Sequence, residues 1–193
     1  MTLVAPSGSL IGFINSFRGL THDPAFARGL AEEIMKGNEK VIAELNGALR
    51  AELTAIIQYM VQAEMCHNWG YRRLGDYIKR QAFGEMRHAE GLIERILFLD
   101  GKPAVDIGLK PKISDNVKAQ LEDDLVDEKD AVRQYNAAIK VCTDAGDNGS
   151  RELFERMVKD EEGHTDDLEG KLQAIQDMGL PNWLTQQLHG EAK

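Results

Sequence analysis

The sequence has few residues that interrupt helices or cross-link chains. Only five prolines occur in 193 residues, and none lies between Pro111 and Pro181. Because an interior proline removes a helix hydrogen bond and clashes with the preceding turn, this scarcity leaves room for long helices. The two cysteines, Cys66 and Cys142, lie far apart. Their spacing argues against a disulfide framework or a thiolate zinc site and fits a reducing cytoplasm.

The chain also lacks a run of about 18 apolar residues and the basic, apolar start of a secretion signal. We therefore expect a soluble, cytoplasmic protein with no membrane span. The chain has fewer basic residues (23 Lys and Arg) than acidic residues (32 Asp and Glu). The resulting net charge of -9 disfavours binding to nucleic acid. Cations are the more natural partners, although charge alone does not assign that function.

Four long segments carry the periodicity of amphipathic helices, and two shorter helices are also predicted. The long segments are residues 38–67, 72–99, 115–145 and 148–178, and the short helices are residues 24–34 and 181–189. The links after the first and third long segments are so short that the flanking helices must form antiparallel hairpins.

The link between the second and third long helices, residues 100–114, is different. Fifteen residues span roughly 50 Å when extended, whereas a helix of 28 residues is roughly 42 Å long. The third helix can therefore begin at the opposite end of the bundle from the point where the second stops. We predict an all-α fold: a ferritin-like four-helix bundle with one long crossover between helices 2 and 3 and a short C-terminal fifth helix.

Six ionisable residues fall on the apolar stripes that bundle helices turn inward. They are Glu52 on the first helix, Glu85 and His88 on the second, Glu128 on the third, and Glu161 and His164 on the fourth. Burying an uncompensated ion costs several kcal/mol, and a whole domain is stable by only about 5–15 kcal/mol. No lysine or arginine occupies the central stripe positions, so bound cations or partial protonation must compensate the carboxylates.

These residues form an internal repeat. Glu85 follows Glu52 by 33 residues, and Glu161 follows Glu128 by 33. The second set, including its histidine, lies 76 residues after the first. A single E-x-x-H is typical of a solvated ion pair, but two copies with matched partners predict a two-metal centre, as in carboxylate-bridged helical bundles. Carboxylate and imidazole ligands together suit iron, manganese or zinc better than calcium.

The segments around these residues resemble the bacterioferritins, from about residue 35 to the end. The matching segments are LRAELTAIIQY around Glu52, NWG at residues 68–70, GEMRHAE around Glu85, RILFLDG before the crossover and KDEEGH ending at His164. The resemblance divides the chain into an extension of unknown role, residues 1–34, and a bacterioferritin domain, residues 35–193. It places the family's ferroxidase ligands on the six residues named above. Tyr59 matches a tyrosine near the family's iron site, and a core aromatic is the alternative role.

The resemblance implies an iron storage protein with ferroxidase activity at a di-iron centre. Its substrates would be ferrous iron and dioxygen or hydrogen peroxide, and its ferric mineral would lie inside a homo-oligomeric shell of twenty-four subunits. Haem b would lie at each twofold interface, with Met86 as axial ligand. Met86 is displaced about 100 degrees from Glu85 around the helix, so it can face a partner subunit. Without the resemblance, a helical methionine is more typical of apolar packing.

Two alternative functions are compatible with the same six metal-binding residues. One is a di-metal redox enzyme of the rubrerythrin peroxidase or manganese catalase type, which stores no mineral; the absence of rubredoxin-like cysteine pairs argues against rubrerythrin. The other is a non-catalytic helical assembly that sequesters metal or uses it only for folding. Aerobic addition of ferrous iron distinguishes the three functions.

Overall fold

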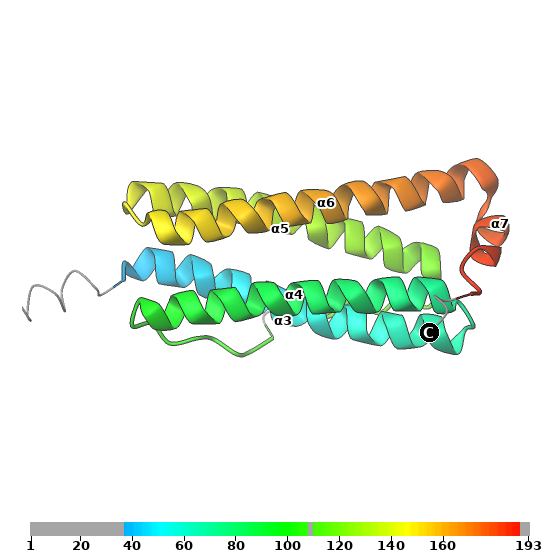
Figure 1. Cartoon of the computed structure of the whole chain (residues 1–193), viewed down its shortest axis with the longest axis horizontal. Helices are drawn as coiled ribbons and strands as arrows, with labels where there is room; N and C mark the ends of the chain where they lie inside the picture. The colour runs from blue at the N-terminus through cyan, green and yellow to red at the C-terminus, as the bar shows by residue number, and fades with distance from the viewer. Residues whose placement is uncertain (1–36, 108–109, 190–193) are drawn as a thin grey trace, which may run out of the picture. The chain divides into compact units, whose positions relative to one another are not determined.

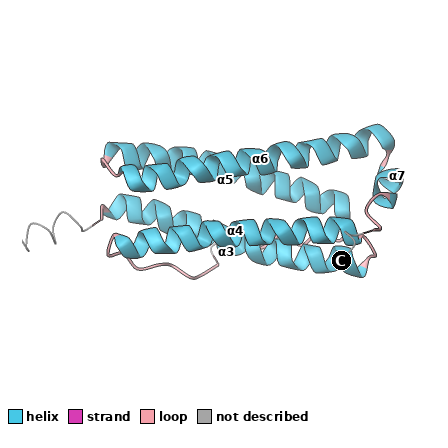
Figure 2. Ribbon diagram, viewed as in Figure 1, coloured by secondary structure: helices cyan, strands magenta, loops and turns pink. Residues whose placement is uncertain are grey.

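The computed structural model describes residues 37–107 and 110–189, and all regular structure in these ranges is helical (Figure 2). The helices are α3 (Glu39–Asn68), α4 (Arg72–Phe98), α5 (Val117–Asp144), α6 (Asn148–Met178) and α7 (Leu180–Thr185). The predicted all-α fold class is confirmed, and α6 matches its predicted range. The helix predicted at residues 24–34 and the extension at residues 1–34 lie outside the described residues.

Short polar caps define where the long helices begin. The side chain of Asn38 accepts a hydrogen bond from the backbone N of Lys40, and Asn116 caps α5 through the N of Ala119. Asp147 accepts from the N of Ser150 at the start of α6. These side chains satisfy amide groups that have no partner within the first helical turn.

The helices form two antiparallel hairpins, α3 with α4 and α5 with α6 (Figure 1). Gly70 and Gly146 lie in the two tight turns with φ of +92° and +70°, a backbone conformation that favours glycine. They are 76 residues apart, the spacing of the predicted repeat. Each hairpin is therefore a copy of one structural unit, and corresponding residues occupy corresponding places.

The crossover follows α3 along the bundle, which fixes the direction of α5. Asn46 accepts a hydrogen bond from the N of Ala104 at 2.6 Å, and Gln58, three turns further along α3, accepts from the N of Lys112 at 2.6 Å. Arg50 pairs with Asp106 between them. The third long helix thus begins where α3 ends and runs antiparallel to it, as the predicted connectivity requires.

The apolar core has two parts. One cluster contains Leu45, Leu49, Leu92 and Phe154, and the other contains Leu74, Ile78, Leu121 and Trp183. The four glutamates on the predicted inward stripes are also buried, at 1–5% exposure. Because apolar packing flanks them toward both ends of the bundle, the helices hold their carboxylates in place.

The clearest difference from the predictions concerns the C-terminal helix. The C-terminal helix was predicted at residues 181–189, whereas α7 spans Leu180–Thr185. It follows α6 directly because Gly179 adopts φ of +79° and ends the longer helix. Among the described helices, none combines the length and apolar character needed to span a membrane.

Candidate metal centre

The structure brings all six predicted ionisable residues together in the middle of the bundle. Their potential ligand atoms form two overlapping groups, within each of which all the atoms lie within 4.8 Å of one another. The first group is Glu52, Glu85, His88 and Glu161, and the second is Glu85, Glu128, Glu161 and His164. Glu85 and Glu161 belong to both groups, so each supplies one carboxylate to two neighbouring positions.

In the first group, one ring nitrogen of His88 faces three carboxylates. Its Nδ1 lies 3.1 Å from Glu85 Oε2, 3.1 Å from Glu161 Oε1 and 3.6 Å from Glu52 Oε1. These four atoms come from three helices, α3, α4 and α6. A cation among them would be held by separate segments of the chain at once.

The second group repeats this arrangement around His164. Its Nδ1 lies 2.8 Å from Glu161 Oε2, 3.4 Å from Glu85 Oε1 and 3.7 Å from Glu128 Oε2. The two oxygens of Glu85 are thus divided between the two histidines, as are the two oxygens of Glu161. This division is the arrangement expected of carboxylates that bridge a pair of metal ions.

Two buried tyrosines support the carboxylates that belong to only one group. Tyr59 donates a hydrogen bond to Glu128, and Tyr135 donates one to Glu52. Burial and the nearby carboxylates raise the pKa of both phenols well above the usual value, so both remain donors at neutral pH. Tyr59 was predicted near the site, whereas Tyr135 was not among the predicted site residues. Its spacing of 76 residues from Tyr59 was the signal that could have found it.

The donor atoms fit a pair of transition-metal ions. Glu85 Oε1, Glu161 Oε2 and His164 Nδ1 are buried but make no hydrogen bond, since the short separations among them are misaligned for one. Buried polar atoms rarely lack a partner. A cation would supply that partner to all three, and mixed oxygen and nitrogen donors are those that iron, manganese or zinc accepts.

Protonation compensates part of the negative charge when metal is not bound. Burial raises the pKa of Glu85 well above its usual value and that of Glu128 to about 7. Burial opposes charge on Glu161 as well, but the imidazoles of His164 and His88 outweigh it and lower its pKa to about 2. The carboxylates likewise outweigh burial at the histidines, raising the pKa of His88 strongly and that of His164 to about 11. Divalent ions must therefore displace protons to bind.

A cavity of about 360 Å³ reaches the cluster between α3 and α5. The site glutamates line it together with Lys110, Lys112, Asp127 and Asp130. Lys112 pairs with Asp127 at 2.6 Å, and both side chains are partly exposed. The cavity thus joins the buried carboxylates to the partly exposed side chains of Lys112 and Asp127 beside the crossover.

Asp124 is a further buried carboxylate, one turn before Glu128, that sequence reasoning missed. It is 2% exposed and accepts hydrogen bonds from Gln58 at 3.0 Å and Gln62 at 2.9 Å. In the sequence it lies in the acidic run EDD, which is typical of a solvated helix face. Only the contact with α3 shows that its side chain points inward.

We expect Asp124→Asn to stabilise the metal-free protein at alkaline pH. Burial raises the pKa of Asp124 to about 7, so the stability that its protonated form contributes is lost as pH rises through that value. Asparagine stays neutral, and its amide can donate to Gln62 Oε1, which is buried without a partner. At about 1.4 kcal/mol per pKa unit, the advantage of the variant should grow by about 2–3 kcal/mol between pH 5 and pH 8. Thermal unfolding in chelator at both pH values measures it.

The matched control for this prediction is Glu122→Gln, two residues away on the exposed face of α5. It removes one negative charge without touching a buried group, and its effect on unfolding should be small at both pH values. An equal gain for both variants would mean that net charge, not burial of Asp124, limits stability.

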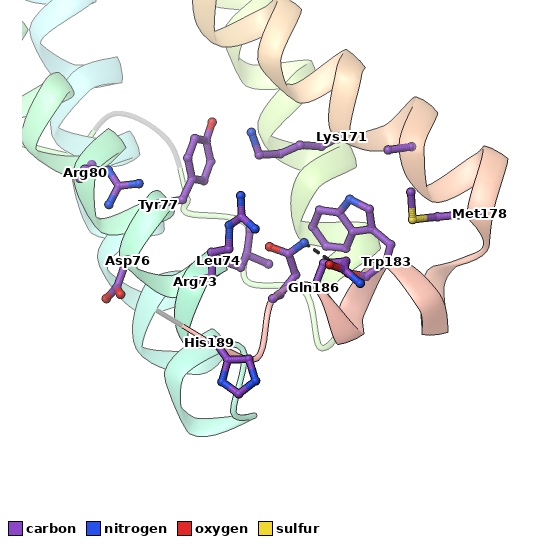
Figure 3. A pocket seen from close by; sticks show the side chains of 12 residues that line it. Arg73, Leu74, Asp76, Tyr77, Arg80, Lys171, Met178, Trp183, Gln186 and His189 are labelled. Carbon is purple, nitrogen blue, oxygen red and sulfur yellow. Dashed lines mark hydrogen bonds between the residues drawn. The ribbon is translucent and has the colours of Figure 1, made fainter. Parts of the chain in front are cut away.

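A second cavity, of about 670 Å³, lies where α7 packs beside α4 and α6 (Figure 3). Arg73, Arg80 and Lys171 contribute to its lining, together with the aromatic rings of Tyr77 and Trp183. Lys171 Nζ lies 3.8 Å from the centre of the Tyr77 ring. Because its charged lining is mainly basic, this cavity does not suit a metal cation, and the buried carboxylate cluster is the candidate site.

Comparisons with known proteins agree with this geometry. The model of the ferritin-like domain matches residues 42–178. A bacterioferritin of Brucella melitensis is 41% identical over 145 residues, which cover 75% of this chain and 90% of that protein. A bacterioferritin of Rhodobacter capsulatus is 40% identical over 145 residues, with the same coverage of each chain. One of Mycolicibacterium paratuberculosis is 38% identical over 146 residues, covering 76% of this chain and 92% of the relative.

Proposed function

Because this chain belongs to the bacterioferritin family, we propose that it oxidises ferrous iron at the buried cluster and stores the ferric product as a mineral. The observation that carries the proposal is the pair of overlapping ligand groups, in which two carboxylates are shared. A site of this kind holds two ions close together, as a ferroxidase needs in order to collect electrons in pairs.

We assign roles to the six residues from their distances. Glu85 and Glu161 are the shared ligands, since each divides its oxygens between the two histidines. Glu52 and His88 complete the first position. Glu128 and His164 complete the second, and Tyr59 and Tyr135 orient the two unshared carboxylates by hydrogen bonds.

The overall reaction removes one electron from each of two ferrous ions and delivers both to dioxygen or hydrogen peroxide. Dioxygen then takes up two protons and becomes hydrogen peroxide, whereas hydrogen peroxide takes up two protons and becomes water. Four carboxylates balance the four positive charges of two ferrous ions, and they stabilise the more highly charged ferric product further. This bias toward the ferric state is the protein's contribution to the driving force. The buried, preorganised ligands hold the ions while the electrons leave.

Aerobic addition of ferrous iron to the purified, metal-free protein tests the proposal. Rapid ferric absorbance at two ions per chain, followed by large iron-loaded particles on size-exclusion chromatography, is the expected result. Turnover of hydrogen peroxide without particles would instead identify a di-metal redox enzyme. If iron is neither oxidised faster than in buffer nor retained, the protein is a non-catalytic assembly and the proposal is wrong.

We further propose that the chain forms a homo-oligomeric shell of twenty-four subunits with haem b between paired subunits. The α3/α4 hairpin exposes large apolar side chains that a second copy would cover: Ile57, Met60, Val61, Phe83 and Met86. Met86 is 42% exposed, whereas its neighbour Glu85 is 2% exposed. One helix can therefore present a carboxylate to the core and a thioether to a haem shared with a partner.

Met86→Leu is expected to reduce haem binding at least tenfold, because leucine keeps the apolar volume but has no sulfur to ligate the iron. The ratio of haem to protein absorbance after reconstitution measures the loss. The control is Met178→Leu, since Met178 is 45% exposed at the end of α6, outside the apolar surface of the α3/α4 hairpin, and should leave haem binding unchanged. An unaltered haem spectrum in Met86→Leu would show that another residue is the ligand.

Three further assignments remain proposals. We place the protein in the cytoplasm, where reduced thiols such as the buried Cys66 and Cys142 persist. We treat residues 1–34 as an extension outside the family domain, residues 35–193, because the ferritin-like match begins at residue 42. We also exclude nucleic acid as a partner, since the net charge is -9.

A further inference from the structure

The two metal positions differ in what lies behind their histidines. The Nδ1 of each imidazole faces the carboxylates, so the other ring nitrogen, Nε2, is available to an outer partner. At His88, Nε2 lies 3.3 Å from Oδ2 of Asp160, at hydrogen-bonding distance. In the ranges that the structure describes, no hydrogen bond is made to Nε2 of His164.

The repeat explains this difference. Corresponding residues of the two hairpins are 76 positions apart, so the counterpart of Asp160 is Gly84. Glycine has no side chain to reach His164, and a Cβ added to Gly84 would meet no atom within 4 Å. The outer carboxylate is therefore missing on one side although there is space for it.

We propose that Asp160 is a positioning residue that makes the site of Glu52 and His88 the tighter of the two metal positions. This inference rests on the proposed function, because it assumes that both positions bind metal. A carboxylate on Nε2 holds the proton there, leaves Nδ1 as the ligand, fixes the ring orientation and makes the imidazole more basic. Loss of such outer partners typically costs about 10–100-fold in metal affinity.

The remaining contacts point the same way. All three buried atoms of the cluster that make no hydrogen bond, Glu85 Oε1, Glu161 Oε2 and His164 Nδ1, belong to the second group. In the first group, His88 is hydrogen-bonded through Nδ1 to Glu85 and through Nε2 to Asp160. The ring of His88 is thus held through both of its nitrogens, whereas that of His164 is held only on the Nδ1 side, where Glu161 Oε2 lies 2.8 Å away. Because Asp160 is largely exposed, water weakens its hydrogen bond, and the lower end of the range applies.

Calorimetric titration of the assembled, metal-free protein with Zn²⁺ tests the inference without any redox reaction. The wild type should bind two ions per chain in two steps that differ by about tenfold or more in affinity. Asp160→Ala should weaken the tighter step about tenfold and leave the other unchanged, and Asp160→Asn should lie between. Gly84→Asp should tighten the weaker step and bring the two steps together.

Glu162→Ala is the control, since it removes an exposed carboxylate two residues from Asp160 on the same helix and should change neither step. The ¹⁵N shifts of the His88 ring in the Zn²⁺-loaded protein supply a second measurement. Asp160→Ala should move the Nε2 shift because the hydrogen bond to that nitrogen is lost, whereas a merely structural role for Asp160 would leave it unchanged. If two ions bind but neither Asp160→Ala nor Gly84→Asp changes a step, the inference is wrong and the proposed function stands. If Zn²⁺ does not bind at two per chain, the proposed function itself fails.

Discussion

Glu161→Gln is expected to reduce the initial rate of ferrous iron oxidation at least 100-fold. Glu161 supplies one oxygen to each ligand group and is 1% exposed. Glutamine lacks the negative charge and has an NH2 group in place of one oxygen, so it cannot serve both metal positions. A change in an outer partner alone typically costs about 10–100-fold in affinity or activity, and a shared inner ligand should cost more. The measurement is the ferric absorbance after addition of two ferrous ions per chain in aerobic buffer.

The matched control is Glu162→Gln, which removes the same functional group from the adjacent, exposed position of α6. Its rate should equal that of the wild type, and both variants should have the oligomeric size of the wild type. Glu85→Gln should lose as much activity as Glu161→Gln, because Glu85 is the other shared carboxylate. A Glu161→Gln protein that keeps a third of the wild-type rate would rule out a shared role for this residue.

Zn²⁺ is expected to raise the thermal unfolding midpoint of the metal-free protein by roughly 10–20 °C. A ligand at about 100 times its dissociation constant stabilises the folded state by about 2.7 kcal/mol per site, and two sites double that value. For a chain of this length, each kcal/mol shifts the midpoint by roughly 2–4 °C. The ions also relieve the cost of four buried carboxylates.

The same shift should grow as pH rises from 6 to 8. The ligands release protons when metal binds, and the carboxylates raise the pKa of His164 to about 11, while burial raises that of Glu128 to about 7. Lower proton concentration favours that release, so apparent affinity increases with pH. Glu52→Gln should retain part of the shift, because Glu52 belongs to only one ligand group. Glu161→Gln should retain almost none, because Glu161 belongs to both. A shift that is independent of pH, or equal in all variants, would place the metal elsewhere.

Much of the fold followed from local patterns. Helix periodicity, sparse proline and the lengths of the links predicted two hairpins and one crossover, because each depends only on residues close in sequence. The end of the last helix was predicted poorly. Residues 186–189 keep a mixture of polar and apolar residues that is compatible with a helix, and the first glycine that could end it is Gly190. The helix nevertheless ends at Thr185.

The candidate ligands were predictable because they repeat, whereas the supporting carboxylates Asp124 and Asp160 were not. The six candidate ligands repeat with one spacing and lie on the inward stripes of four helices, and the structure brings them together. Asp124 and Asp160 lie among other acidic residues in sequence, in the runs EDD and KDEEGH, so nothing local distinguishes a buried or paired carboxylate from a solvated one. Only the packing of α3 against α5, and of α4 against α6, shows which carboxylate contacts Gln58 or His88.

Anomalous X-ray scattering from crystals soaked in Co²⁺ or Zn²⁺ tests the two-metal centre most directly. We expect two peaks per chain, each within about 2.0–2.2 Å of one histidine Nδ1, with oxygens of Glu85 and Glu161 beside both peaks. A single peak, or peaks only on the protein surface away from His88 and His164, would contradict it.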